Sequence, residues 1–350
     1  MVAKVLTISN EKGGVGKSFL AVQTAFYAAY QCGCKTLFID LDSQANASRV
    51  LIKNEMVTLS NIKPADLFLT GEERDINPEA EIGGEENSNL QLISAINSKE
   101  ELISLQENQE SELIQMYSNF VEAIGVLKSQ FDLIVIDSNP NADIRSNSAV
   151  GVADIIISPI QLYTESIQGL EGIVNRVGQL NNTARVYFIP NMVDHSELQV
   201  RTAEKLVAMN KDMLLPIHEI SVTRNDDQIV IEECELHYGV IKRRNCFAVA
   251  QDIGKGVWIV NNNKSGWREI RRVLFTIMEA IDVDKEFSAA DEVVFSLEKL
   301  KQAHPDKWKR LLRHLWMCGH TFGFTLPGLS QGDVQNLIGL KETSPISLVS

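Results

Sequence analysis

Residues 10–18, NEKGGVGKS, constrain the fold of this chain more than any other stretch. They follow an apolar run at 4–9 and precede a run at 17–33 with the composition and length of a helix. A glycine-rich turn between a strand and a helix lets backbone N–H groups close around phosphate oxygens, and the helix N-terminus adds partial positive charge. The spacing predicts a phosphate-binding loop formed by Gly13, Gly14, Val15, Gly16, Lys17 and Ser18.

Short apolar runs alternate with helical patterns along most of the chain. The expected strands are 4–9, 35–42, 90–95, 131–137, 154–161 and 184–194, with 218–223 as a further candidate. This alternation predicts an α/β fold, a parallel twisted sheet with helices on both faces. Ligands of such sheets bind beyond the carboxyl ends of the strands. One site is therefore expected to gather Lys12, Asp42, Asp137 and Asn191, which all come just after strand-like runs.

The pattern changes towards the end of the chain. A helical pattern at 98–129 precedes the strand at 131–137, and an acidic stretch at 71–88, rich in Gly and Pro, is expected to be a loop. After residue 283 the strand–helix alternation stops. We therefore expect two domains, 1–283 and a C-terminal helical extension at 284–350.

Charge and cysteine content limit the classes of function. The net charge is -13, but residues 1–239 contain 17 Lys and Arg against 34 Asp and Glu, whereas residues 240–350 contain 16 against 12. Contact with a polyanion is therefore expected to use the C-terminal third. The five cysteines form no CxxC pair, and the N-terminus lacks the features of a signal peptide. These features favour a reduced, cytoplasmic protein.

The loop departs from the general phosphate-loop pattern GxxxxGK[ST], since Glu11 stands at its first glycine position and the string reads KGGVGKS. This string resembles the deviant Walker A ATPases of the ParA/MinD family, and most closely the ParA type. The resemblance implies a Mg²⁺-dependent ATPase with the P-loop NTPase fold, and a homodimer with ATP sandwiched between its subunits. It also implies that Lys12 reaches the phosphates bound by the partner, while Lys17 serves those of its own chain. The resemblance covers roughly residues 1–283.

Two further segments resemble the switch regions of this family. FIDLDSQANAS at 38–48 is similar to its DxDPQGN segment, with Ser43 in place of proline and Ala45 in place of glycine. The resemblance makes Asp42 the residue that orients or activates the attacking water. Asp40 then supports the Mg²⁺ shell, to which Ser18 is a direct ligand.

The segment FDLIVIDSNP at 131–140 resembles the Walker B segment, which makes Asp137 an outer-shell Mg²⁺ ligand. Ser138-Asn139-Pro140 follows this aspartate, where the family usually has a small residue and two prolines. The aspartate's role is therefore better supported than the geometry of the loop after it.

Contacts to the base have weaker support. By resemblance, Asn191 contacts the adenine, although a turn-forming Asn explains the same residue almost as well. Arg224 and Asn225 are expected either at the base, at the dimer interface or in a solvated turn. Phe19, which follows the loop, is assigned to the nucleotide site with Ser18.

The ParA resemblance further implies that the ATP-bound dimer holds nonspecific DNA. It also implies that a cargo- or centromere-binding partner stimulates hydrolysis. Lysines and arginines are the side chains such salt-sensitive retention needs. The candidates are Lys242, Arg243, Arg244, Lys264, Arg268, Arg271 and Arg272. The last four share one face of a helix, which is equally typical of a solvated face. The basic stretch 299–314 either extends this surface or docks through Trp308 and its leucines.

Three rival functions remain from the sequence. A MinD-like membrane-associated ATPase needs a cationic amphipathic C-terminal helix, and the end LKETSPISLVS lacks one, so no membrane is expected. An ATP-dependent amide-forming ligase is a second rival. An iron–sulfur carrier is a third, but the cysteine spacing does not suit a cluster. The favoured function is a partition or cargo-positioning ATPase, cytoplasmic and nucleoid-associated when ATP is bound.

Overall fold

The computed structural model describes residues 2–69, 80–81, 88–168, 170–194, 196–217, 220–225, 228–233, 237–260 and 264–281. Contacts between residues divide the chain into two compact units. One comprises Met1–Leu215 and Tyr238–Val283, and the other Pro216–His237 and Asp284–Ser350. The extension expected at 284–350 and the basic stretch 299–314 lie outside the described residues, so their structure stays a prediction.

The first unit is built on one nine-stranded sheet in the order β13-β8-β7-β1-β6-β2-β5-β3-β4. Neighbouring strands pair in parallel, except that β4 pairs antiparallel with β3 at one edge. The strands are β1 (Lys4–Ile8), β2 (Thr36–Asp40), β3 (Val57–Ser60), β4 (Ala80–Glu81), β5 (Leu90–Ile93), β6 (Leu133–Asp137), β7 (Ile155–Ile160), β8 (Arg185–Val193) and β13 (Ile241–Lys242).

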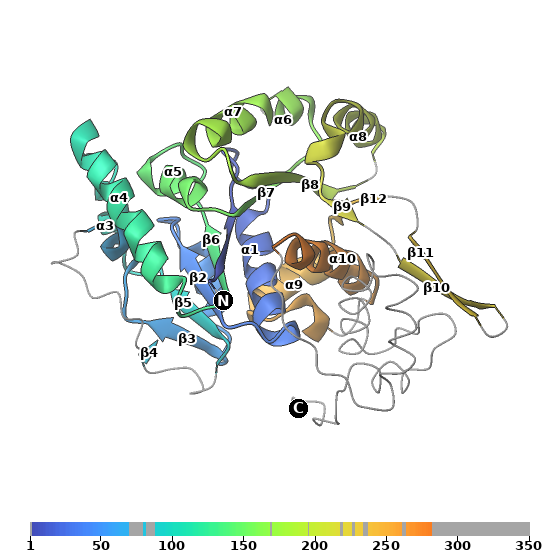
Figure 1. Cartoon of the computed structure of the whole chain (residues 1–350), viewed down its shortest axis with the longest axis horizontal. Coiled ribbons are helices and arrows are strands. Elements are labelled where there is room, and N and C mark those ends of the chain that lie inside the picture. Colours follow the sequence, from blue (N-terminus) through green and yellow to red (C-terminus); the bar gives the residue numbers. More distant parts are fainter. Residues whose placement is uncertain are drawn as a thin grey trace. The chain divides into compact units, whose positions relative to one another are not determined.

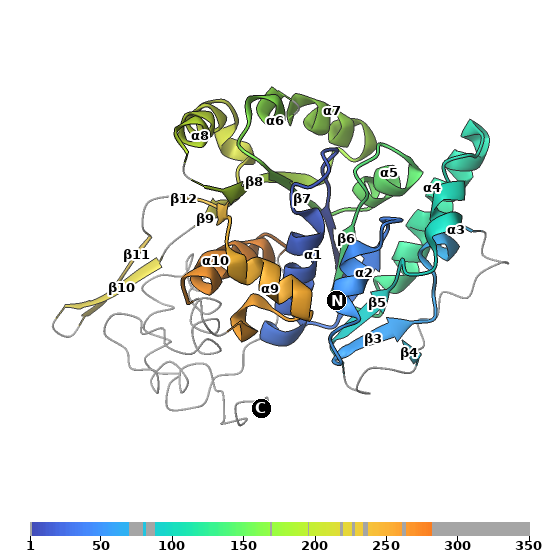
Figure 2. The same ribbon diagram turned by 180° about the vertical axis from the view of Figure 1, so that it is seen from behind.

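Helices cover both faces of this sheet (Figure 1; Figure 2 gives the view from behind), which confirms the predicted α/β fold. Those of one face are α4 (Glu110–Leu127), α5 (Ile144–Gly151), α7 (Leu170–Leu180) and α8 (Glu197–Asn210), and those of the other include α1 (Lys17–Phe26), α9 (Asn245–Ile253) and α10 (Lys264–Ile281). The shorter helices are α2 (Asn46–Leu51), α3 (Lys99–Ser104) and α6 (Thr164–Gln168), with 3-10 turns at Pro64–Phe68, Lys211–Met213 and Val257–Ile259.

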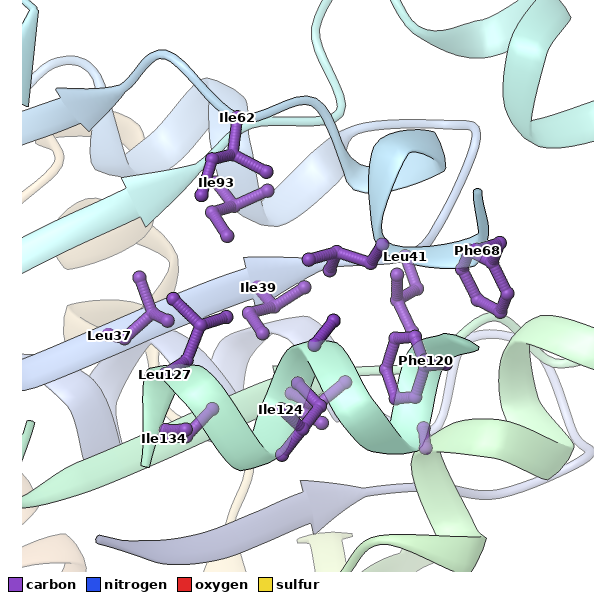
Figure 3. Close-up of a cluster of buried hydrophobic side chains, with 14 of the residues drawn as sticks. Leu37, Ile39, Leu41, Ile62, Phe68, Ile93, Phe120, Ile124, Leu127 and Ile134 are labelled. Atoms are coloured by element: carbon purple, nitrogen blue, oxygen red, sulfur yellow. The ribbon is translucent and has the colours of Figure 1, made fainter. Parts of the chain in front are cut away.

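The central strands β2 and β6 are buried along their whole length, and their apolar residues follow one another without alternation because both faces of the sheet are covered. Figure 3 shows one of these faces, where Ile39 of β2 and Ile134 of β6 pack near Ile124 and Leu127 of α4. At the end of this cluster the rings of Phe68 and Phe120 stack, with their centroids 4.7 Å apart. This packing holds the carboxyl ends of β2 and β6 in register.

Several predicted elements take a different form. The helical pattern at 98–129 forms two helices, because Asn108 donates to the carbonyl of Ser104 at the end of α3 and Glu112 caps the start of α4. The expected helix at 17–33 continues from α1 into a π-helical turn, Tyr27–Gln31, and Gly33 follows at φ 64°. In the main sheet, strands β3, β4 and β13 were not predicted, and β4 lies within the stretch 71–88 that was expected to be a loop.

The candidate strand at 218–223 does not extend the main sheet. Its described residues, 220–223, lie in β10 (Ile220–Asn225), which pairs antiparallel with β11 (Gln228–Glu233) in a separate two-stranded sheet. Another two-stranded sheet contains β9 (Pro216–Ile217) and β12 (His237–Tyr238). Of the acidic stretch at 71–88, only β4 and Ser88 are described.

Candidate nucleotide site

The glycine-rich loop joins the end of β1 to the first turn of α1, as its sequence predicts. Gly14 has φ 72° and Gly16 has φ 94°, which are left-handed conformations that side chains with a Cβ rarely adopt. Gly16 is also the N-cap of α1, and the cap has no side-chain hydrogen bond. The first N–H groups of α1 have no partner within the helix and lie next to these left-handed glycines. This is the backbone arrangement that binds phosphate at a helix N-terminus.

Asn191, near the end of β8, forms a hydrogen bond to the backbone of this loop. Its Nδ2 donates to the carbonyl of Val15 at 2.7 Å, and its Oδ1 accepts the N–H of Met192. A Cβ on Gly16 would lie 2.2 Å from the same Nδ2, so the loop approaches β8 as closely as glycine permits. The predicted adenine contact of Asn191 stays a prediction. What the structure adds is a hydrogen bond between its amide and the loop.

Lys17 lies in the first turn of α1, only 8% exposed. Its ammonium donates to the carbonyl of Lys12 at 3.1 Å. Burial lowers the pKa of Lys17, and the nearby Asp137 and Asp42 partly oppose that shift. The structure thus places Lys17 close to Asp137 and Asp42, two of the residues that were expected at one site because they follow strand-like runs.

Asp137 and Asp40 face each other across neighbouring strands, since they are paired in the register of β6 and β2. Asp137 is fully buried, and neither of its carboxylate oxygens has a hydrogen-bond partner among the described residues. Burial raises the pKa of Asp137 well above its usual value, and the charge of Asp40 adds to that rise. The nearby hydroxyl of Ser18 lowers this pKa in part, although its position does not meet the distance and angle of a hydrogen bond to the carboxylate.

Asp40, equally buried, is saturated by its own chain. It accepts hydrogen bonds from the backbone N–H of Ser48 at 2.9 Å and its hydroxyl at 2.6 Å, and from the N–H of Asp42 at 3.1 Å. The Ser48 hydroxyl also accepts the N–H of Ala95, just after β5. Burial raises the pKa of Asp40 to about 6. Asp40 therefore ties together the ends of β2 and β5 and the start of α2.

Asp42 comes two residues after β2 and is partly exposed. Its carboxylate accepts the N–H of Gln44 at 2.9 Å, which forms a tight turn in the segment that leads to α2. Ala45, in that turn, has φ 53°, the left-handed region that the glycine expected there adopts more readily. Asp42 thus stands beside Lys17 with one face towards solvent.

The segment after Asp137 lacks the first of the two expected prolines, and hydrogen bonds hold it instead. Ser138 donates from its N–H and its hydroxyl to the carbonyl of Ile8. Asn139 donates to Asp143, the N-cap of α5, whose carboxylate also pairs with the buried Arg145 at 2.6 Å. This replacement explains how Asn139 can stand where proline was expected.

Lys12 is exposed at the entrance of the loop. Its ammonium lies 5.4 Å from the ring centroid of Tyr163 and 3.4 Å from the hydroxyl of Ser166 on α6. Its neighbour Glu11 pairs with Arg176 of α7 at 3.2 Å. In the single chain the Lys12 side chain is therefore held by solvent-accessible contacts to the loop after β7 and to α6.

Sequence reasoning missed two amides that position the loop. Asn10 bonds to β7 and to the N–H of Lys12, and Gln161, just after β7, donates to the carbonyl of Gly14 at 3.3 Å. Asn10 directly follows the strand predicted at 4–9, and Gln161 is the last residue of the strand predicted at 154–161, which is the signal that could have identified them. Polar side chains at that edge of a parallel sheet are candidates for the site.

The geometry suits a nucleotide with Mg²⁺. Mg²⁺ keeps several of its waters and takes only one or two carboxylates, with phosphate oxygens completing its shell. Within the described residues there is no cluster of three or more His, Cys, Asp or Glu side chains that could hold a metal ion. The unpartnered carboxylate of Asp137 and the nearby hydroxyl of Ser18 are the groups that would hold Mg²⁺ beside the loop.

The structure describes the side chains of some of the remaining predicted contact residues but not of others. Phe19 packs its ring against Phe247 of α9, with centroids 5.1 Å apart, so it helps to support α1. Arg244 forms an ion pair with Glu269 at 2.7 Å, whereas Arg243 is exposed. Arg271 and Arg272 lie on α10. The side chains of Arg224, Lys264 and Arg268 lie outside the described part of the structure. The DNA contacts stay predictions.

Comparison with known proteins agrees with this geometry. The profile of a family described as an AAA domain matches residues 3–188, more than half of the chain. The relatives include Protein IncC of Escherichia coli, 29% identical over 220 residues, and the chromosome partitioning protein ParA of Myxococcus xanthus, 29% identical over 187 residues. The chain belongs to this AAA-domain family, as a member of its ParA/MinD type.

The alignments leave part of each protein unmatched. The IncC alignment covers 61% of this chain and 57% of the relative, and the ParA alignment covers 50% and 58%. The chain thus spans somewhat more than half the length of these curated relatives.

Solved structures share the fold of this ParA/MinD member. A putative plasmid partition protein from Borrelia burgdorferi bound to AMPPNP has a TM-score of 0.57 at 20% identity, covering 80% of this chain and 99% of its own. The septum site-determining protein MinD from Pyrococcus horikoshii, complexed with Mg-ADP, has a TM-score of 0.55 at 16% identity, covering 81% and 99%. At these identities the likeness concerns the fold alone.

Proposed function

We propose that the chain is a Mg²⁺-dependent ATPase switch that dimerises with ATP between its subunits. The observation that carries the proposal is the buried, unpartnered carboxylate of Asp137 beside Lys17 and the left-handed glycines of the loop. A buried carboxylate without a partner is costly, and a bound cation would offset that cost. The two solved structures that share this fold, one bound to AMPPNP and the other complexed with Mg-ADP, support the same ligands.

Different residues of the chain carry out the separate tasks of hydrolysis. The loop N–H groups and Lys17 bind and orient the phosphates, and Asp137 and Ser18 hold Mg²⁺, which when bound neutralises phosphate charge. Asp42, partly exposed beside Lys17, accepts a proton from or orients the attacking water. Asp40 supports the magnesium shell indirectly, by fixing the backbone of Asp42. Asn191 holds the loop against β8 and is proposed to contact the base.

In this proposal each phosphate site is complete only when the Lys12 side chain of a second chain reaches it. The Lys12 side chain is exposed, and a second chain bound at this entrance would bring its phosphates towards the Lys12 ammonium. The contacts to Tyr163 and Ser166 are weak enough to be exchanged, since a cation–π contact at an exposed site is worth about 0.5–1 kcal/mol. We infer that Lys12 leaves them on dimerisation and completes the partner's phosphate site.

The mechanism predicts a specific effect of Asp42→Ala. Removing this carboxylate leaves the phosphate and Mg²⁺ ligands in place, so hydrolysis is expected to fall by about 10²-fold or more while an ATP-bound dimer accumulates. Phosphate release and light scattering measure the two effects. Lys17→Ala is the contrasting variant and is expected to prevent nucleotide-dependent dimerisation. Hydrolysis by Asp42→Ala at the parental rate would contradict the assignment.

For the dimer we propose retention on nonspecific DNA and release by a cargo- or centromere-binding partner, in plasmid or chromosome partition or the positioning of another cargo. The partition functions named for the relatives support this. The proposed surface centres on Lys242 and the exposed Arg243, with Arg271, Arg272, Lys264 and Arg268 on α10. Arg244 is its weakest member, because Glu269 already neutralises it.

Mobility shifts on arbitrary DNA at low salt test the DNA contact. Retention is expected only with ATP, and Arg243→Ala is expected to weaken it and to reduce its salt dependence. Lys99→Ala, an exposed cation at the start of α3, is the matched control and should bind like the parent. Absence of ATP-dependent binding would overturn the DNA part of the proposal, and sedimentation with liposomes would then test the MinD-like alternative.

The described residues test the membrane alternative only in part. No helix in the described ranges is sufficiently long and apolar for a membrane crossing. The segment on which an amphipathic attachment would depend, after residue 283, lies outside those ranges. Localisation to the nucleoid in the ATP-bound state is part of the proposal and follows from DNA retention.

A further inference from the structure

We propose that Asn10 is a positioning residue that sets the direction in which Lys12 leaves the loop, and thereby controls dimerisation rather than nucleotide binding. The inference rests on the proposed function, in which Lys12 reaches a second copy of the chain. Asn10 lies outside the glycine-rich string, and its side chain bonds to Ser158, Pro159 and the N–H of Lys12, not to the groups proposed to bind phosphate.

The Asn10 side chain forms a strut between β7 and the loop entrance. It is 7% exposed. Its Nδ2 donates to the hydroxyl of Ser158 and the carbonyl of Pro159, both at 3.0 Å. Its Oδ1 accepts the N–H of Lys12 at 2.8 Å. Both amide hydrogens are therefore used on β7, and the oxygen is used on Lys12.

Lys12 is consequently held at both of its backbone polar groups. Asn10 binds its N–H, and the ammonium of Lys17 donates to its carbonyl at 3.1 Å. Its side chain, in contrast, is exposed and makes only the contacts to Tyr163 and Ser166. The main chain of Lys12 is thus fixed while its side chain can change partners.

A fixed main chain is what a lysine acting between two chains requires. The flexible four-carbon stem of lysine carries about 2 kcal/mol of rotamer entropy, so the protein can preset only the point and direction from which the stem departs. A small misplacement of a group that must meet its target is costly. Loss of the hydrogen bonds of Asn10 would keep the Lys12 side chain itself but would lower the fraction of time in which it points towards the partner.

This arrangement separates two kinds of brace. Asn191 lies beneath Val15, inside the phosphate cradle, so its loss should affect nucleotide affinity. Asn10 lies before the cradle and holds only Lys12. Asn10→Ala is therefore expected to leave ATP-analogue affinity within about threefold of the parent and to weaken ATP-dependent dimerisation about tenfold, which corresponds to about 1.4 kcal/mol, within the range for one hydrogen bond.

The test compares Asn10→Ala with the parent, with Lys12→Ala and with the double variant. Fluorescence titration with an ATP analogue, at concentrations below dimerisation, measures affinity, and sedimentation velocity measures dimerisation. The double variant should dimerise no more weakly than Lys12→Ala alone, because Asn10 acts through Lys12. A further loss in the double variant, or a parallel fall in ATP affinity, would overturn the proposal.

Asn54→Ala is the matched control for an ordinary loss of a buried amide. Asn54 is 4% exposed, and its Oδ1 accepts the N–H of Met56 two residues on, as Asn10 does with Lys12. This variant should change neither affinity nor dimerisation. Ser158→Ala, which removes one anchor of Asn10 without touching the loop, should weaken dimerisation in the same direction but less.

A measurement on the nucleotide-free chain separates this inference from the proposed function. Hydrogen exchange at the Lys12 amide should become faster in Asn10→Ala, because the amide loses its acceptor. Unchanged exchange would contradict the strut, whatever the oligomeric state. If the parent does not dimerise with ATP, the proposed function fails, while the exchange result still decides whether Asn10 holds Lys12.

Discussion

Asp40 and Asp137 occupy paired positions at the ends of β2 and β6, and both are fully buried. Asp40 accepts three hydrogen bonds from its own chain, whereas the carboxylate oxygens of Asp137 accept none from the described residues. Two carboxylates with the same burial and the same place in the sheet thus have opposite surroundings. Asp40 therefore stabilises the fold at the site, whereas Asp137 is available for a ligand.

The largest expected effect comes from Asp137→Asn. The substitution keeps the shape but removes the charge, so affinity for ATP in the presence of Mg²⁺ should fall by about 10-fold to 100-fold. The nucleotide-free chain should be as stable as the parent or more so, because a buried carboxylate that accepts no hydrogen bond from the described residues is removed. Analogue titration with and without Mg²⁺, together with thermal unfolding, measures both. A large loss of stability would show that Asp137 supports the fold as Asp40 does.

Asp40→Asn should show the reverse pattern. The amide cannot accept all three hydrogen bonds as the carboxylate does, so the free energy of unfolding should fall by about 1–3 kcal/mol. Affinity for Mg²⁺ and ATP in the folded protein should change much less than in Asp137→Asn. Denaturant unfolding of Asp40→Asn, Ser48→Ala and the double variant tests the pairing, and additive losses would argue against a direct bond between the two side chains.

The smallest expected effect is a pH dependence of stability. Burial raises the pKa of Asp40 to about 6, above the unfolded value near 3.8, so the folded chain binds the proton more tightly. This contribution is fully present below about pH 4 and is lost as the pH rises through 6. Burial also raises the pKa of Asp137, which acts in the same direction. Unfolding of the parent and Asp40→Asn between pH 4 and 7 measures the difference, which should shrink as the pH rises.

The fold could be predicted largely because its central strands are short, apolar and separated by helical patterns. Strand β13 has only two residues, too short for a pattern to stand out. Strand β3 has four residues, as β5 does, but only Val57 and Leu59 of them are apolar, against three in β5. The hairpin strand β10 looked like another member of the series because composition does not state which strand a segment pairs with. The split between α3 and α4 depends on capping by Asn108 and Glu112 within a continuous helical pattern.

The site could be predicted as a set of positions but not as a set of contacts. The glycine string indicates a phosphate loop, and the strand-end aspartates indicate where its partners lie, since local sequence carries both signals. Asn10 and Gln161 escaped notice because their partners lie on β7 or in the loop, some 150 residues away in the chain. Asn191 was expected at the site, yet its bond to Val15 spans 176 residues and has no local signature.

The phosphate loop, the parallel sheet and the carboxylates at its edge could be recognised in local sequence, because backbone conformation and burial patterns depend on residues close together in the chain. Which carboxylate accepts hydrogen bonds and which is available, and the bond by which Asn10 holds Lys12 to β7, depend instead on tertiary contacts. Those outcomes depend on which donors the packing of distant strands brings within about 3 Å, the distance at which a hydrogen bond forms.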